Sequence, residues 1–226
     1  MADLFTQEVE ETGFVVTGEM VPTIFQPFWF ARNNLIRDEE ADKATVTVIH
    51  KQGASFSTDW FTFVATTDRI VLTTEDPSKF LPLRDLLSGI LNLLEHTPIR
   101  ALGFNTDAHY SAPTEEAWHR LGDYYAPKVG WERVLVKPGM LDVLVKGTRE
   151  GSKSAGVHIR IEPSVKFSPG VYFSINEHFD LVDLAARRQR LVVTELLYLI
   201  EEEWDGFVKY KSRALDQLIQ NASPKS

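Results

Sequence analysis

Hydrophobic and polar positions along this chain follow two periods, and each period predicts a different kind of element. Strand-like stretches rich in β-branched and aromatic residues occupy Phe14–Met20, Ala44–His50, Ser55–Thr66 and Arg69–Thr74. Residues 24–36 and 80–94 instead place large apolar side chains three and four positions apart, which predicts helices. The first part of the chain is therefore expected to form a strand, a helix, three strands and a helix.

The same order of elements recurs further along the chain. A strand pattern at Ile99–Phe104 precedes a short helix. Three strand candidates follow at residues 133–148, 156–161 and 171–175, and a long helix is expected at 183–220. A Pro-Thr pair opens the first helix of each half, at Pro22-Thr23 and Pro113-Thr114. We therefore predict an α+β protein with an internal duplication of a β-α-β-β-β-α unit. Residues 1–97 and 98–226 are expected to form the two units, each an antiparallel sheet with helices packed on one side.

This order of elements resembles the repeat of saddle-shaped duplicated folds, of which the TATA-box-binding protein is the familiar member. The resemblance covers the element order over nearly the whole chain and includes no sequence motif. Likeness of fold does not transmit function. The strands also lack the basic residues that DNA binding at a concave face would require, so no functional residue is carried over.

Charge and composition narrow the classes of partner. The net charge of −8 argues against broad contact with nucleic acid or an anionic membrane. The longest apolar runs, such as Leu196–Ile200, are far shorter than the ~20 residues that span a bilayer. The absence of cysteine excludes disulfides, thiolate metal sites and cysteine nucleophiles. A cytoplasmic protein without membrane contact is the expectation that follows.

Two groups of polar residues are placed where a catalytic site could form. Asn176, Glu177 and His178 follow a predicted strand, and Asn105 and His109 follow the first strand of the second unit. Loops at strand ends often carry functional residues, and a histidine beside a carboxylate can act as a general base. The alternative is structural, because Asn and Glu favour turns and His178 could cap the helix that follows.

Motifs for other chemistries are missing. The chain has no phosphate-binding loop, no dinucleotide fingerprint and no nucleophile elbow. Glu115 and His119 lie one helical turn apart, with His109 upstream, but the tight spacing of a zinc-protease helix is absent. We therefore expect neither a metal nor a cofactor.

Two aromatic residues lie off the faces that their neighbours share. Phe30 departs from the helical face of the preceding aromatics, and Trp60 points away from Phe61 and Phe63 on a strand. Either they line a ligand pocket between the two units, or they pack in the core.

The last helix is the feature that bears most on function. Residues 183–220 would span roughly 57 Å as a helix, at ~1.5 Å per residue, whereas a domain of this size is nearer ~30–40 Å across. Its second half keeps an apolar stripe made of Trp204, Phe207, Val208, Leu215, Leu218 and Ile219. We predict that this stripe docks on a second chain, either another copy or a different protein. A bend at Gly206 that returns the helix to its own sheet is the alternative.

These features favour a non-catalytic interaction or assembly protein, acting as an oligomer or as a subunit of a larger complex. Two other classes remain open. The first is a hydrolase that uses His178 with Glu177 and with Asn105 or His109. The second is a small-ligand sensor with a pocket between the two units, lined by Phe30 and Trp60.

Overall fold

The computed structural model describes residues 5–181 and 189–222. Within these ranges the chain forms one antiparallel sheet of nine strands and five α-helices, the longest of which is C-terminal. The strands are β1 (Thr6–Gly18), β2 (Thr45–His50), β3 (Gly53–Ser57), β4 (Thr62–Thr66), β5 (Arg69–Thr74), β6 (Ile99–Ser111), β7 (Val143–Gly147), β8 (Gly156–Pro163) and β9 (Gly170–Asp180). The helices are α1 (Pro27–Arg32), α2 (Asp38–Lys43), α3 (Phe80–Leu93), α4 (Glu115–Tyr125) and α6 (Gln189–Asn221). The expected α+β class is confirmed.

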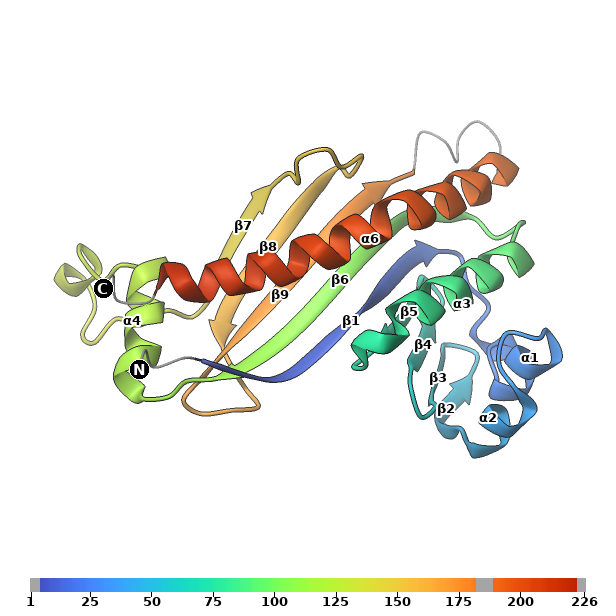
Figure 1. The fold of residues 1–226 in the computed structure, drawn as a ribbon, viewed down its shortest axis with the longest axis horizontal. Helices are drawn as coiled ribbons and strands as arrows, with labels where there is room; N and C mark the ends of the chain where they lie inside the picture. Colours follow the sequence, from blue (N-terminus) through green and yellow to red (C-terminus); the bar gives the residue numbers. More distant parts are fainter. Residues whose placement is uncertain (1–4, 182–188, 223–226) are drawn as a thin grey trace.

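The sheet runs without a break through both halves of the sequence. Its strand order is β2-β3-β4-β5-β1-β6-β9-β8-β7, so β1 and β6 pair at its centre, from Thr6 opposite Ser111 to Gly18 opposite Ile99. The separate sheet expected for each unit is therefore corrected to one shared sheet. The long paired strands β1 and β6 join the two halves along their whole length (Figure 1).

Several strands differ in their bounds from the sequence pattern, and β1 begins at Thr6 rather than at Phe14. The stretch 55–66 forms two strands, because Thr58 makes a turn in which its N–H donates to the Phe61 carbonyl at 2.9 Å. The Thr58 hydroxyl also accepts from the Trp60 and Phe61 N–H groups, a typical threonine turn. β6 and β9 continue well beyond their predicted ends at Phe104 and Ile175, because their later polar residues alternate onto the uncovered face.

One face of the sheet carries the core. A row of large apolar side chains crosses five neighbouring strands on this face, in the order Phe56, Phe63, Leu72, Phe14 and Phe104. Trp204 of α6 packs on the row, with its ring centroid 4.1 Å from that of Phe14. Phe30 of α1 packs on the same row against Phe56 and Phe63 and is fully buried. Phe30 therefore belongs to the core rather than to a pocket wall.

The long helix lies along its own sheet instead of projecting beyond it. Figure 1 shows α6 running the length of the molecule over β6 and β9, with α3 over β1 and β5. Its 33 residues span about 50 Å, and the 13-residue strands at the sheet centre span about 43 Å, so helix and sheet nearly match in length. The helix also passes through Gly206 without interruption.

The apolar stripe of α6 is consequently covered by this chain itself. Trp204, Phe207, Leu215 and Ile219 are at most 8% exposed, and Val208 and Leu218 pack on the same core. Their burial removes the reason to expect that a second chain must cover them. Within the described residues, no helix is both long enough and apolar enough to cross a membrane.

Candidate functional site

Polar side chains line the sheet face opposite the core. Asn105 of β6 and Asn176 of β9 stand directly opposite each other, and the Asn176 amide donates a hydrogen bond to Asn105 Oδ1. Asn176 also stands opposite His158 of β8. The structure thus brings together two of the predicted site residues. They lie in the middle of long strands rather than at strand ends, which corrects their expected position.

His109 lies further along the same face of β6, in a separate polar group. Its Nδ1 shares a hydrogen bond of 2.8 Å with Ser164 Oγ, and its ring centroid is 4.7 Å from that of Tyr172. The Tyr172 hydroxyl donates to Asp107. Burial lowers the pKa of the His109 imidazole and raises the pKa of the Tyr172 phenol, so both groups favour their neutral forms.

Glu177 and His178 point to opposite faces of β9, because neighbouring side chains alternate along a strand. His178 faces the open side, between Gly103 on β6 and Gly156 on β8. Glu177 faces the core and is completely buried. The two side chains therefore do not form an acid–base pair with each other, and β9 continues past His178, so it caps no helix.

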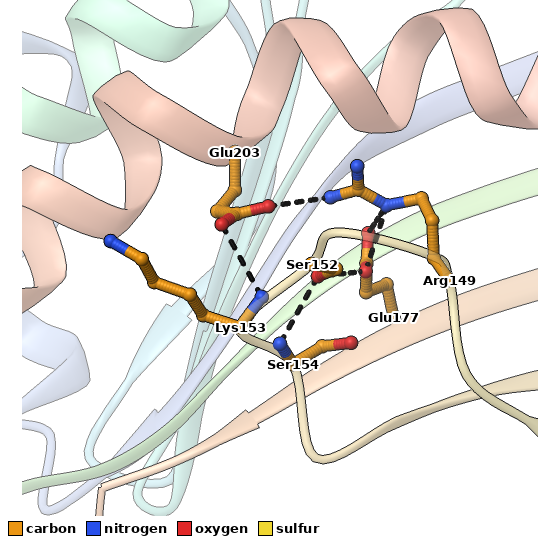
Figure 2. Close-up of polar contacts among 6 residues, drawn as sticks. All are labelled: Arg149, Ser152, Lys153, Ser154, Glu177 and Glu203. Carbon is orange, nitrogen blue, oxygen red and sulfur yellow. Dashed lines mark hydrogen bonds and ion pairs between the residues drawn. The ribbon is translucent and has the colours of Figure 1, made fainter.

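Glu177 instead belongs to a buried charged cluster that includes Arg149 and Glu203 (Figure 2). Arg149 Nε donates to Glu177 Oε1 at 3.0 Å, and Arg149 Nη2 donates to Glu203 Oε2 at 2.7 Å. The Ser152 hydroxyl donates to Glu177 at 2.6 Å, and the Lys153 N–H donates to Glu203. These bonds tie the loop between β7 and β8 to α6, which makes the cluster a clamp on that hairpin.

Sequence reasoning missed two members of this cluster. Glu203 lies three residues after Ile200 and four before Phe207, on the buried stripe of α6. That spacing was a usable signal for a buried carboxylate. Arg149 follows β7 in a hairpin loop, and nothing in its local sequence indicates a partner 54 positions away.

A group of exposed apolar side chains is concentrated near α4 and β7. Sixteen large hydrophobic residues are exposed among the described residues, and nine of them fall between positions 124 and 145. We call these nine the apolar surface: Tyr124, Val129, Trp131, Val134, Leu135, Val136, Leu141, Leu144 and Val145. Each is more than half exposed, and Val136 reaches 93%. Large exposed apolar patches commonly mark sites where a protein binds another protein, a membrane or a ligand.

The apolar surface is hollowed rather than flat. A cavity of about 760 Å³ lies between α4 and the segment that follows it, with Trp118, Leu121, Val136 and Met140 in its walls. A smaller hollow of about 220 Å³ is lined by Trp131, Leu135, Leu141 and the residues just before β7. The two hollows share Leu135 and Met140, so the surface is continuous from α4 to the start of β7.

This surface lies where the sequence pattern predicted a strand. The stretch 133–148 was expected to pair in the sheet, but only β7 does so, and residues 126–142 form a loop with one 3-10 turn at Trp131–Arg133. Pro138 and Gly139 interrupt the stretch and Gly130 has a positive φ of 98°, both of which favour a loop. The exposed apolar residues from Val134 onward were counted as strand, so their exposure was not anticipated, and Val129 and Trp131 lie before that stretch.

β7 is the outermost strand at its end of the sheet. It pairs with β8 in unbroken register over all five of its residues, and Leu144–Gly147 are exposed. The strand at the other end, β2, has a register shift between Val46 and Val48. Irregularities of that kind blunt a sheet edge, and β7 has none. Its outer backbone edge is therefore regular and open to another strand.

Trp60, the other predicted pocket residue, lies on the half of the sheet formed by the first strands. Its indole N–H donates to Glu40 Oε1 at 2.7 Å. It borders a small hollow of about 280 Å³ together with Glu11 and Thr73. This hollow is polar, which does not favour an apolar ligand there.

No protein-family model matches this chain, and no curated protein matches it. In the part of the chain that the structure describes, no group of three or more histidine, aspartate and glutamate side chains is arranged to hold a metal ion.

Proposed function

We propose that this chain is a non-catalytic interaction or assembly protein, and that the apolar surface is where it docks. The observation that carries the proposal is the clustering of nine exposed large apolar side chains in 22 consecutive positions, 124–145. At the exposures found, they present on the order of 800 Å² of apolar area. That is about what each partner buries in a standard protein–protein interface, and large for the patch of a typical monomer.

The hydrolase alternative has weaker support. Its carboxylate, Glu177, is buried and paired with Arg149, on the opposite face from His178. Asn105 and Asn176 bond to each other through neutral amides, which transfer no protons at ordinary pH. The small-ligand alternative has one supporting feature, the cavity beside α4, whose volume lies within the usual range for ligand sites.

Photo-crosslinking in cells would test the docking proposal. A photoreactive phenylalanine analogue at Val136, within the full chain expressed in its own cells, should give a covalent adduct of higher mass. The matched control places the same analogue at Phe28, which is 69% exposed on α1, and should give little adduct. Equal yields at the two positions, or no adduct at Val136, would contradict docking at the apolar surface.

We also propose that the sheet arose by internal duplication. Reading outward from the centre, the order is β1, β5, β4, β3, β2 in one direction and β6, β9, β8, β7 in the other. In each direction the first strand of a half is followed by its last strand. Pro22 opens a 3-10 turn after β1, and Thr114 caps α4 after β6. A crystal structure should superpose residues 13–96 on 98–220 with Pro22 and Pro113 equivalent; unrelated positions for these prolines would refute the duplication.

A further inference from the structure

We infer that the partner at the apolar surface is a second copy of this chain, joined by antiparallel pairing of β7 with β7 of that copy. The inference rests on the proposed function and specifies its partner. In this arrangement the sheet continues across a two-fold axis, and both copies contribute the same surface, as a symmetric dimer requires.

The exposed edge of β7 supplies the backbone for this pairing. An unprotected sheet edge presents unpaired N–H and C=O groups to any strand that approaches. β7 keeps regular register with β8 throughout, contains no proline, and has its last four residues exposed. Beyond its end, the bonds from Arg149 to Glu177 and Glu203 hold the hairpin against α6 (Figure 2). The edge is thus ordered before a partner arrives, which lowers the entropy cost of binding.

In one register, the side chains of β7 and of the residue before it match the same side chains of the second copy. When the two-fold axis passes at Leu144, Leu144 faces its own copy and Val143 faces Val145. The same register places Asp142 opposite Lys146 twice, once on each side of the axis. Opposite charges directly across a strand pair are stabilising, and like charges are destabilising. Neither Asp142 nor Lys146 forms an ion pair with any described residue of its own chain.

Other registers lose this match. An axis at Val145 places Lys146 opposite Leu144 and Asp142 opposite Thr148, and an axis at Val143 places Lys146 opposite Met140. Both leave the charges without partners. The axis at Leu144 also sets Leu141 opposite Gly147, where a Cβ would meet no atom within 4 Å, so the leucine has room.

The apolar area is continuous with this edge. The smaller hollow includes Leu141 and Asp142, and Leu144 and Val145 of the apolar surface lie on β7 itself. Because neighbouring side chains alternate along a strand, pairing the two edges sets Leu144 beside Leu144 on one face of the joined sheet and Val143 beside Val145 on the other. Leu141, which lines the smaller hollow, lies next to this seam.

Charge reversal with rescue tests the register. Light scattering of the intact chain should give about 51 kDa, twice the 25.7 kDa of one copy. Lys146→Glu places a second carboxylate opposite Asp142, and Asp142→Lys places a second ammonium group opposite Lys146. Because each variant puts like charges directly across the strand pair, each should raise the dimer dissociation constant about tenfold or more. The double variant Asp142→Lys/Lys146→Asp restores opposite charges and should return the constant to near the original value. Circular dichroism of each variant confirms that the fold is kept.

The matched control is Lys51→Glu, which makes the same charge change on the exposed turn between β2 and β3 and should leave the dimer intact. A monomeric intact chain, or a dimer that responds equally to Lys51→Glu and Lys146→Glu, overturns the inference. The two proposals fail in different ways. A monomer whose Val136 analogue crosslinks to a different protein leaves the docking function standing and removes the self-pairing. A monomer without a crosslink removes both.

Discussion

Arg149 pairs with two buried carboxylates, so one positive charge compensates two negative charges. Glu177 is fully buried and Glu203 is 6% exposed, and both depend on the same guanidinium for a positive partner. Burying charge without a partner is costly, whereas paired and hydrogen-bonded charge is tolerated. The position of Arg149 beside α6 depends in turn on Gly206, the helical residue that its guanidinium crosses.

Removing the cation should destabilise the fold strongly. Arg149→Met leaves both carboxylates buried without compensation, and we expect a loss of about 3–5 kcal/mol in the free energy of unfolding, measured by urea denaturation. Arg84→Met is the matched control, because Arg84 pairs with the exposed Asp85 and its removal should cost less than about 1 kcal/mol. Equal losses in the two variants would show that the buried cluster contributes no more than a surface pair.

The effect of Gly206→Ala on the free energy of unfolding should have opposite signs in the natural chain and in the Arg149→Met variant. Alanine normally stabilises a helix interior by roughly 0.5–1 kcal/mol relative to glycine. Here a Cβ at position 206 would lie 2.7 Å from Arg149 Nη1, so it must displace the paired guanidinium. We therefore expect Gly206→Ala to destabilise the natural chain and to stabilise the Arg149→Met variant. Stabilisation in both backgrounds would mean that the arginine shifts aside freely.

At the scale of elements, the period of α6 was correctly predicted but its contact partner was not. The spacing of Trp204, Phe207, Leu215 and Ile219 indicates one apolar face, and that face could equally cover the chain's own sheet or another chain. The length of the central strands settles the matter, because they support nearly the whole helix. Similarly, Glu177 and His178 were predicted as one site, and the pleat of β9 separates them.

Truncation distinguishes core from docking surface in α6. A chain that ends at Glu203 loses four large core side chains, each worth roughly 1.5–3 kcal/mol, and this exceeds the margin of most domains. We expect that chain to lack the near-ultraviolet circular dichroism of a packed core. A chain that ends at Ala222 keeps these residues and should remain folded. A folded monomer after truncation at Glu203 would restore the docking role first expected for the stripe.

At the scale of the whole molecule, the two halves share one sheet and one core. β1 pairs with β6 over 13 residues, and Phe14 of the first half contacts Trp204 of the second. A boundary near residue 97 therefore separates sequence units that depend on each other for burial. This arrangement leaves β2 and β7 as the edges of the sheet, and β7 as the regular one.

The first half alone should not fold. A fragment of residues 1–97 exposes the β1 edge that β6 covers and the Phe14 face that α6 covers. We expect no cooperative thermal transition for this fragment and no amides with slow hydrogen exchange, in contrast to the full chain. A cooperative transition in the isolated fragment would instead establish residues 1–97 as an autonomous domain.

Local patterns in the sequence were sufficient to predict the α+β class, the antiparallel pairing of the strands, α3 and the long C-terminal helix. These follow from hydrophobic periods that neighbouring residues determine among themselves. Tertiary structure alone decided three features that bear on function: α6 covers its own sheet, Glu177 meets Arg149 and Glu203, and the apolar residues of 124–145 remain uncovered. Each depends on which distant segments meet, and residues such as Arg149 and Glu203, 54 positions apart, have no local period that relates them.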